Sequence, residues 1–357
     1  MSPEAVSSSP AMLVRLRPTS PWRLGPDCGS RDRVDPVCHS DTLYSAVCSA
    51  FEQLGLLPDW LQATAAGAGA SEVRFSSCFP FVGETLFVIP PRHVWPPPAT
   101  SKVRWKGARF VPLAAVERLV AGAALSEDHW VVDGASGCLL PVVPRGNLRG
   151  PFRTVSRPAA AVDRLSGGAI EPHATACLEF CEGAGLWLVV AFASEWAQER
   201  WLEPVQAAFR LLADSGIGGE RSRGWGRSSS PEFEPGCLPG MILAPSFEPA
   251  PADETGVPGP QPETAWWLLS LFSPAESDQV DWQRGQYALA GREGRIESRA
   301  RWGELKRPVR MVAEGSVLVA GAPPVGAARD VAPEGFPHPV YRAGFAVAIP
   351  IPYRGAA

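Results

Sequence analysis

A glycine-rich stretch between residues 216 and 227 constrains this chain more than any other part of the sequence. It reads Gly-Ile-Gly-Gly-Glu-Arg-Ser-Arg-Gly-Trp-Gly-Arg, with five glycines in the eleven residues 216–226. Glycine costs about 1 kcal/mol relative to alanine inside a helix, and it weakens strands as well. The stretch therefore predicts a loop whose backbone takes positive φ angles and comes close to an anion or to a second backbone.

The flanking residues place this loop between a helix and a strand. Apolar side chains recur at helical spacing from Val205 to Leu212, which predicts a helix over 204–214 with Pro204 in its first turn. Gly216 then ends the helix. A strand is expected over 225–233.

Arginine and serine side chains stand among the glycines, and backbone amides together with guanidinium groups suit a phosphate chain. The P-loop pattern is absent and no strand precedes a GxGxxG spacing, so a nucleotide cofactor is not predicted. The alternative is an ordinary glycine turn with no ligand. The candidate RNA-binding residues of the loop are Gly218, Gly219, Arg221, Ser222, Arg223, Gly224 and Gly226.

This loop resembles the glycine-rich signature of the RAMP proteins of CRISPR effector complexes, where it closes a ferredoxin-like βαββαβ domain. Alternation over residues 12–17 predicts a half-buried strand. An apolar stripe predicts a helix that opens near His39, is capped by Ser40 or Asp41, and ends at Gly55. The stretch His-Ser-Asp-Thr-Leu at 39–43 resembles the opening helix of the subunit-four family of type III-A (Csm) complexes.

His39 and Ser40 are therefore further candidate RNA-binding residues. A proton-transfer role for His39 is disfavoured, because no second acid or base is evident near it in the sequence. A histidine that is satisfied locally at the start of a helix is the simpler interpretation.

A second arginine cluster follows, with one arginine every four residues from Arg145 to Arg157. Interspersed glycines and prolines forbid a helix, so an extended or hairpin segment is predicted. Residues 163–168 resemble the Asp-Arg-x-Thr-Gly motif that precedes the thumb hairpin of RAMP backbone subunits, with Ser166 in the threonine place. The alternative is a solvated basic loop. The candidate phosphate contacts are Arg145, Arg149, Arg153, Arg157 and Arg164.

Length and composition bound the remaining possibilities. A chain of 357 residues favours two domains, and its net charge of −4 allows one local basic groove rather than a basic surface throughout. No run of 18 apolar residues and no signal-peptide pattern is present. The eight cysteines form no CxxC pair, so reduced thiols in a cytoplasmic protein and no metal site are expected.

Further stretches around Phe79-Pro80, 315–319 and 338–344 resemble the same subunit-four family, in the same order along residues 12–350. The resemblance implies an α+β chain with two ferredoxin-like (RRM-like) domains, the first with a thumb-like hairpin insertion. The expected organisation is a disordered 1–10, a first domain over 11–243, a proline-rich linker over 244–263, and a second domain over 264–357.

The resemblance further implies a non-catalytic subunit in antiviral defence, without cofactor or metal. Its implied partners are the 5′ tag of the crRNA, the large cyclase/polymerase-type subunit and the adjacent backbone RAMP subunit, with no membrane. Three alternatives stay open. They are the equivalent subunit of a Cmr or type III-D complex, a metal-independent repeat-RNA endonuclease of the same superfamily, and a scaffold protein that binds no RNA.

Overall fold

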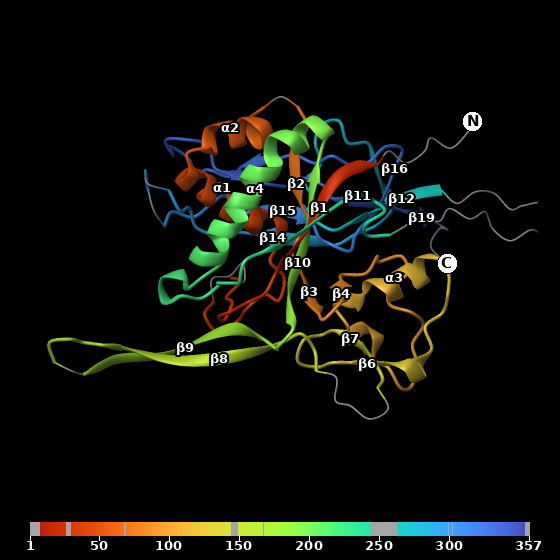
Figure 1. The fold of residues 1–357 in the computed structure, drawn as a ribbon, viewed down its shortest axis with the longest axis horizontal. Coiled ribbons are helices and arrows are strands. Elements are labelled where there is room, and N and C mark those ends of the chain that lie inside the picture. The colour runs from red at the N-terminus through yellow and green to blue at the C-terminus, as the bar shows by residue number, and fades with distance from the viewer. Residues whose placement is uncertain are drawn as a thin grey trace, which may run out of the picture.

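The computed structural model describes residues 8–25, 30–67, 69–143, 149–166, 168–243, 263–298, 300–301 and 303–353. Two antiparallel sheets form its centre, and a long hairpin projects away from them (Figure 1). Arg145 lies outside the described residues. Most of the expected disordered start (1–10) and most of the expected linker (244–263) also lie outside them.

The first sheet has the strand order β11-β1-β10-β3-β4-β5, and β2 also pairs with β10. Its centre is β10, in which all nine residues are buried, and which pairs with β1 through partners such as Val14 and Leu188. The bounds are β1 Ser9–Leu16, β2 Val73–Phe75, β3 Phe79–Val82, β4 Thr85–Val88, β5 Val111–Pro112, β10 Ala184–Phe192 and β11 Glu232–Leu238.

Two long helices, α1 (Ser40–Leu54) and α4 (Glu195–Ser215), connect the strands of this sheet. The connection runs β1, α1, β2 and β3, then β10, α4 and β11, so β1 and β10 lie side by side in the middle of the sheet. Aromatic rings join the helices to the sheet: Trp60 of the short α2 (Leu57–Leu61) lies 4.6 Å from Phe51 and 5.2 Å from Trp201, centroid to centroid.

A long insertion separates β4 from β10. It contains α3 (Leu113–Val120), the pair β6 (Trp130–Val132) and β7 (Leu139–Pro141), and the hairpin of β8 (Phe152–Val162) and β9 (Ala169–Phe180). The hairpin extends far from the body of the molecule (Figure 1). Short 3-10 turns lie at Trp105–Gly107, Glu127–His129 and Arg221–Arg223, and a π-helical turn at Gln62–Ala66.

The second sheet has the order β13-β16-β12-β19. Numbered by their order along the chain, these strands are the second, third, first and fourth of the sheet. In the first sheet the strands β3, β10, β1 and β11 lie in the same order, second, third, first and fourth along the chain. No helix occurs between residues 263 and 353 in the described part of the chain. The strands are β12 Glu263–Leu268, β13 Val280–Gln286, β14 Leu289–Arg292, β15 Val309–Val312, β16 Val317–Ala320, β17 Arg329–Asp330, β18 Tyr341–Arg342 and β19 Ala348–Tyr353.

The predicted helix from His39 to Gly55 and the predicted strand over 12–17 are confirmed as α1 and β1. The predicted boundaries of α4 were wrong, because this helix begins at Glu195 and contains Pro204 in its interior. The hydroxyl of Ser194 accepts a hydrogen bond from the Ala197 amide and caps the start. The following strand begins at Glu232 rather than near 225.

The described residues were also compared with what the sequence predicts for membrane-spanning helices, metal sites and cysteines. No helix in the described residues is long and apolar enough to cross a membrane. Within the same residues no cluster of histidine, cysteine and acidic side chains has the arrangement of a metal site. The seven described cysteines are free thiols.

Candidate nucleic-acid interface

The glycine loop packs against a second stretch of backbone. Gly216, Gly218, Gly224 and Gly226 all have positive φ angles, as expected. A Cβ atom on Gly218 would lie 2.3 Å from the carbonyl oxygen of Arg23. Glycine is therefore required here by the close approach of two chains, one of the two possibilities that the sequence left open.

This packing occupies part of the loop's hydrogen-bonding capacity. The Gly219 amide donates to the Arg23 carbonyl at 2.8 Å, and the Gly226 amide donates to the Pro21 carbonyl at 2.8 Å. The expectation that the Gly219 amide contacts a phosphate is thus replaced by an internal hydrogen bond. What remains for a ligand is the outer side of the loop, where Ser222 and Arg223 are exposed.

Two of the three arginines of the loop are ion-paired. The Arg221 guanidinium donates to both carboxylate oxygens of Glu297 at 2.6 Å, which ties the loop to the C-terminal part of the chain. Arg223 lies 3.2 Å from the Glu220 carboxylate. These pairs are partly solvent-exposed, so their contribution to stability is small.

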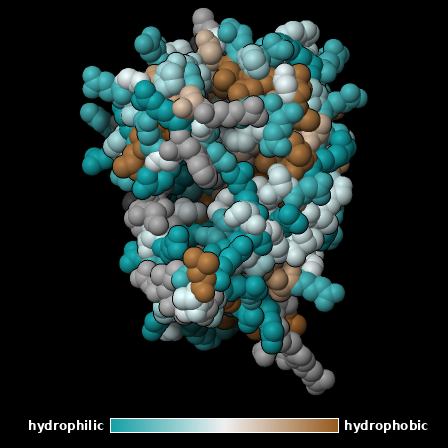
Figure 2. Space-filling model, turned by 90° about the vertical axis from the view of Figure 1, so that its left-hand side faces the viewer, coloured by the Kyte–Doolittle hydropathy of each residue, from teal (hydrophilic) through white to brown (hydrophobic). Residues whose placement is uncertain are grey.

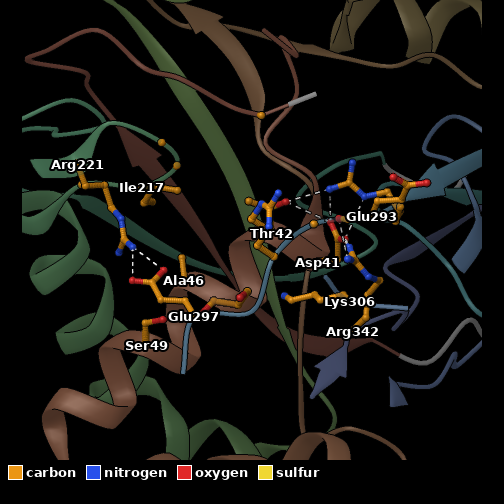
Figure 3. A pocket seen from close by; sticks show the side chains of 18 residues that line it. Asp41, Thr42, Ala46, Ser49, Ile217, Arg221, Glu293, Glu297, Lys306 and Arg342 are labelled. Carbon is orange, nitrogen blue, oxygen red and sulfur yellow. Dashed lines mark hydrogen bonds and ion pairs between the residues drawn. The ribbon is translucent and has the colours of Figure 1, made fainter. Parts of the chain in front are cut away.

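A cleft opens between the glycine loop, α1 and residues 292–306 of the second domain (Figure 3). Its volume is about 480 Å³. Five cationic and three anionic side chains line it, so its walls carry an excess of positive charge. They are Arg221, Arg292, Arg295, Lys306 and Arg342, and Asp41, Glu293 and Glu297.

Asp41 is the centre of the deepest part of this cleft. It is 4% exposed, and its carboxylate accepts two hydrogen bonds from Arg292, at 2.9 and 3.0 Å, and one from Arg342. Burial by itself would raise the pKa of Asp41, but the charges of Arg292 and Arg342 outweigh it and hold this pKa well below its usual range. Two buried guanidinium groups thus share one carboxylate.

The neighbours of Asp41 in the sequence also join the two domains. His39 bonds Glu314 through Nδ1 at 2.7 Å and Asp35 through Nε2 at 3.0 Å. Ser40 accepts a hydrogen bond from the Leu271 amide at 3.1 Å, and its own amide donates to the hydroxyl of Ser77.

These contacts correct two expectations. His39 is 8% and Ser40 5% exposed, and both side chains are engaged within the protein, so neither is placed to contact RNA. Ser40 and Asp41 also do not cap α1, because the N-cap residue is His39 and it makes no side-chain cap. The motif at 39–42 instead joins the start of α1 to residues of the C-terminal part of the chain, which contains the second sheet.

The second predicted set of arginines lies on the projecting hairpin. Arg153 and Arg157 are on β8, and both donate to the Glu179 carboxylate on β9, at 3.1 and 2.6 Å. Arg149 precedes the hairpin, and Arg164 is exposed at its tip. The prediction of an extended hairpin segment is confirmed.

The motif at 163–168 forms the tip of the hairpin, not the stretch that precedes it. Asp163 accepts hydrogen bonds from the Leu165 amide at 3.0 Å and from the Ser166 hydroxyl at 2.6 Å, which close the turn. Leu165 is 99% exposed. The side of the molecule toward which the hairpin points is mainly hydrophilic, with most of its hydrophobic groups in the upper half of the view and a smaller number in the lower half (Figure 2).

The sequence did not identify Arg292, Lys306 and Arg342 as site residues. Residues 292–310 include seven basic and three acidic residues. This composition indicates a basic segment but does not say which part of the molecule it faces. Only the packing of the second domain against α1 brings this segment opposite the glycine loop.

Comparison with known proteins now bears on this geometry. Residues 261–351 match the family described as the CRISPR Csm4 C-terminal domain. No curated protein matches the sequence.

Solved structures have the same fold over nearly the whole chain. A chain of the Csm3-Csm4 subcomplex in the type III-A CRISPR-Cas interference complex is 15% identical, with a TM-score of 0.59, 96% of this chain and 99% of that chain covered. A chain of the Csm1-Csm4 cassette in complex with cA4 is 18% identical, with a TM-score of 0.54 and coverages of 96% and 98%. At these identities the similarity establishes the fold.

Proposed function

We propose that this protein is the crRNA-binding subunit of a type III-A (Csm) effector complex. The proposal is supported by the match of residues 261–351 to the Csm4 C-terminal domain and by the Csm4 fold of the chain. This subunit binds the 5′ tag of the crRNA and performs no catalysis. We infer two domains, over 11–243 and 264–357, joined by 244–263. The first is ferredoxin-like, and the second keeps the same strand order but has no helix among its described residues. The proposal includes a cytoplasmic location and a role in antiviral defence.

The observation that carries RNA binding is the cationic cleft beside the glycine loop. Single-stranded RNA is held by basic side chains that follow its phosphates, together with pockets for bases that leave the stack. The cleft supplies both, because it is rich in arginine and is bordered by serines of α1. The hairpin of β8 and β9 adds a second arginine-bearing surface for the same strand.

The partners follow from the solved relatives. Those structures contain Csm4 together with Csm1 or with Csm3. We infer that this chain docks on the corresponding large subunit and on the adjacent backbone subunit. The overall charge of −4 leaves acidic surface for protein partners around a local basic cleft.

Three alternatives receive less support. An endonuclease needs an accessible acid or base, whereas His39 is buried between two carboxylates. A scaffold without RNA would gain nothing from several cations in one cleft. The equivalent subunit of a Cmr complex is disfavoured by the Csm4 domain match.

The test is co-expression of the tagged chain with the large and backbone subunits of its own complex and a repeat-spacer RNA. We expect a purified assembly that contains crRNA with an intact 5′ tag, and crosslinks from the tag to this chain. Purified assembly without RNA contacts on this chain would favour the scaffold. Cleavage of repeat RNA by the isolated chain would favour the endonuclease.

A further inference from the structure

Lys306 lies at the junction of two cavities. The first is the cleft beside the glycine loop, and the second is a side pocket of about 220 Å³ on the other flank of α1. Both cavities are lined by Ser45, Ser49, Arg295, Glu297 and Lys306, so they adjoin each other at these side chains.

The ammonium group of Lys306 has an unusual setting. Its side chain extends from beside Arg342 toward the middle of the cleft (Figure 3). No salt bridge to it is found among the described residues, while the nearby Asp41 carboxylate is already shared by Arg292 and Arg342. Burial, and then the charge of Arg342, lower the pKa of Lys306. An anion beside this ammonium would relieve both effects.

The side pocket has different chemistry. Apolar and aromatic groups dominate the part that it does not share with the cleft, namely Tyr44, Leu57, Leu61, Ile296, Pro339, Val340 and Tyr341. Its volume is below the roughly 300–1,000 Å³ of pockets that enclose drug-sized ligands, which suits one flat ring rather than a whole nucleotide. A nucleobase that leaves the stack needs such an aromatic, partly apolar surface.

We propose that Lys306 marks a single-nucleotide subsite, in which one phosphate of the bound RNA lies beside Lys306 in the cleft and the attached base turns into the side pocket. This inference rests on the proposed RNA-binding function and specifies where one nucleotide sits. Arg342 and Arg292 form the floor of the phosphate site, and Tyr341 forms a wall of the base site.

Amine labelling tests the phosphate site directly. The chain contains only three lysines, Lys102, Lys106 and Lys306, so each is followed separately by peptide mass spectrometry. Lys106 lies on an exposed 3-10 turn away from the cleft and serves as the internal control. In the assembled complex, we expect tag RNA to abolish labelling of Lys306 and to leave labelling of Lys106 unchanged.

Variants separate the two halves of the subsite. Lys306→Met should reduce the slope of log affinity against log salt by about 0.7, the contribution of one phosphate contact to a single strand. Tyr341→Leu should weaken RNA binding with no change in this slope, since it removes a flat ring and no charge. Lys106→Met should change neither the affinity nor the slope.

The outcomes distinguish this inference from the proposed function. RNA that binds without protecting Lys306, or an unchanged slope in Lys306→Met, would overturn the subsite and leave RNA binding standing. Absence of any bound RNA would overturn both. Protection of Lys306 by inorganic phosphate at the same ionic strength, to the same extent as by RNA, would assign the site to a free phosphate ion instead.

Discussion

Nδ1 of His39 lies 2.7 Å from Oε1 of Glu314, a residue 275 positions farther along the chain. The other ring nitrogen lies 3.0 Å from the Asp35 carboxylate. Burial opposes a charged ring, but the charge of Glu314 and the hydrogen bonds to Asp35 and Glu314 outweigh it and raise the pKa of His39 to about 10. The start of α1 is therefore joined to the second domain by a charged imidazolium between two carboxylates.

The first prediction is that the free energy of unfolding falls as pH rises from about 6.5 to about 10. Folded His39 keeps its proton up to a pKa of about 10, whereas an unfolded histidine loses it near 6.5. In this range the folded state binds one proton more, so stability falls by up to about 1.4 kcal/mol per pH unit. Denaturant unfolding across this range measures the slope.

His39→Gln is the control for this slope, because other groups also titrate at high pH. The variant should be much less stable than the parent near pH 6 and should approach it near pH 10. Asp35 gives the free energy of unfolding the opposite pH dependence at low pH. Its pKa is lowered to about 2 in the folded protein, so the stability that it contributes is lost as pH falls from about 4 toward 2. If the free energies of unfolding of the parent and His39→Gln differed by the same amount at all pH values, the imidazole ring of His39 would be neutral in the folded protein.

The second prediction concerns the carboxylate that Arg292 and Arg342 share. Asp41→Asn keeps the shape of the side chain but removes the negative charge that the buried guanidinium groups of Arg292 and Arg342 both contact. Removal of one partner from a buried ion pair typically costs about 3–5 kcal/mol. We expect a loss of this size in the free energy of unfolding, with both domains affected together.

Asp128→Asn is the matched control, because Asp128 also forms an ion pair, with Lys102, but on the exposed surface. Such pairs contribute little, so we expect no measurable loss of stability. Equal effects of the two substitutions would mean that the junction at Asp41 is hydrated and does not hold the domains together.

The sequence predicted the elements better than their partners. Periodicity identified α1 because this helix buries one apolar stripe, which is a local property of the chain. The role of the motif at 39–42 depends on residues far away in the sequence. His39 bonds Glu314, Ser40 bonds the Leu271 amide, and Asp41 bonds Arg342, and these partners all lie in the C-terminal part of the chain.

The errors of boundary have separate physical causes. Pro204 was placed at a helix start because its missing amide is tolerated there, but the capping hydroxyl of Ser194 starts α4 earlier and the helix accommodates the proline in its interior. The motif at 163–168 was expected before a hairpin because it resembles a motif in that place in RAMP backbone subunits, but here Asp163 and Ser166 close the turn at the hairpin tip. The cleft itself is formed only when the two domains pack.

The third prediction compares two adjacent glycines of the loop. Gly218 has a φ of +92°, and a Cβ there would meet the Arg23 carbonyl oxygen, so Gly218→Ala should cost about 1–3 kcal/mol and detach the loop from residues 21–25. At Gly219 a Cβ would lie 3.2 Å from Cδ of Arg23, a buried side chain whose guanidinium donates to four backbone carbonyls. Gly219→Ala should therefore cost less than Gly218→Ala, because it needs only a small shift and no positive φ.

RNA retention by the purified complex then tells how the loop acts. We expect Gly218→Ala to lose RNA, because the loop borders the cleft and its position sets the width of that cleft. Gly219→Ala should retain RNA, because the Gly219 amide is already bonded to Arg23. Loss of RNA in Gly219→Ala with a normal fold would restore a direct phosphate contact at this glycine.

The last prediction uses the carboxylate that pairs with the hairpin arginines. Arg153 and Arg157 both donate to Glu179, so each must give up part of this pairing to contact a phosphate. Glu179→Gln removes the competing charge while it keeps a side chain of the same size. If the hairpin lies on the RNA, this variant should bind more tightly and with a steeper salt dependence than the parent.

The double variant Arg153→Ala/Arg157→Ala should act in the opposite direction. Loss of two phosphate contacts flattens the slope of log affinity against log salt by about 1.4, equally for tag and scrambled RNA, because phosphates carry no sequence. Salt titrations with the large subunit present measure both variants side by side. Since the three side chains form one exposed cluster, neither change should affect stability appreciably. A pair of variants that shift the slope in opposite directions would place the hairpin on the RNA, whereas two unchanged slopes would leave these arginines as a solvated surface.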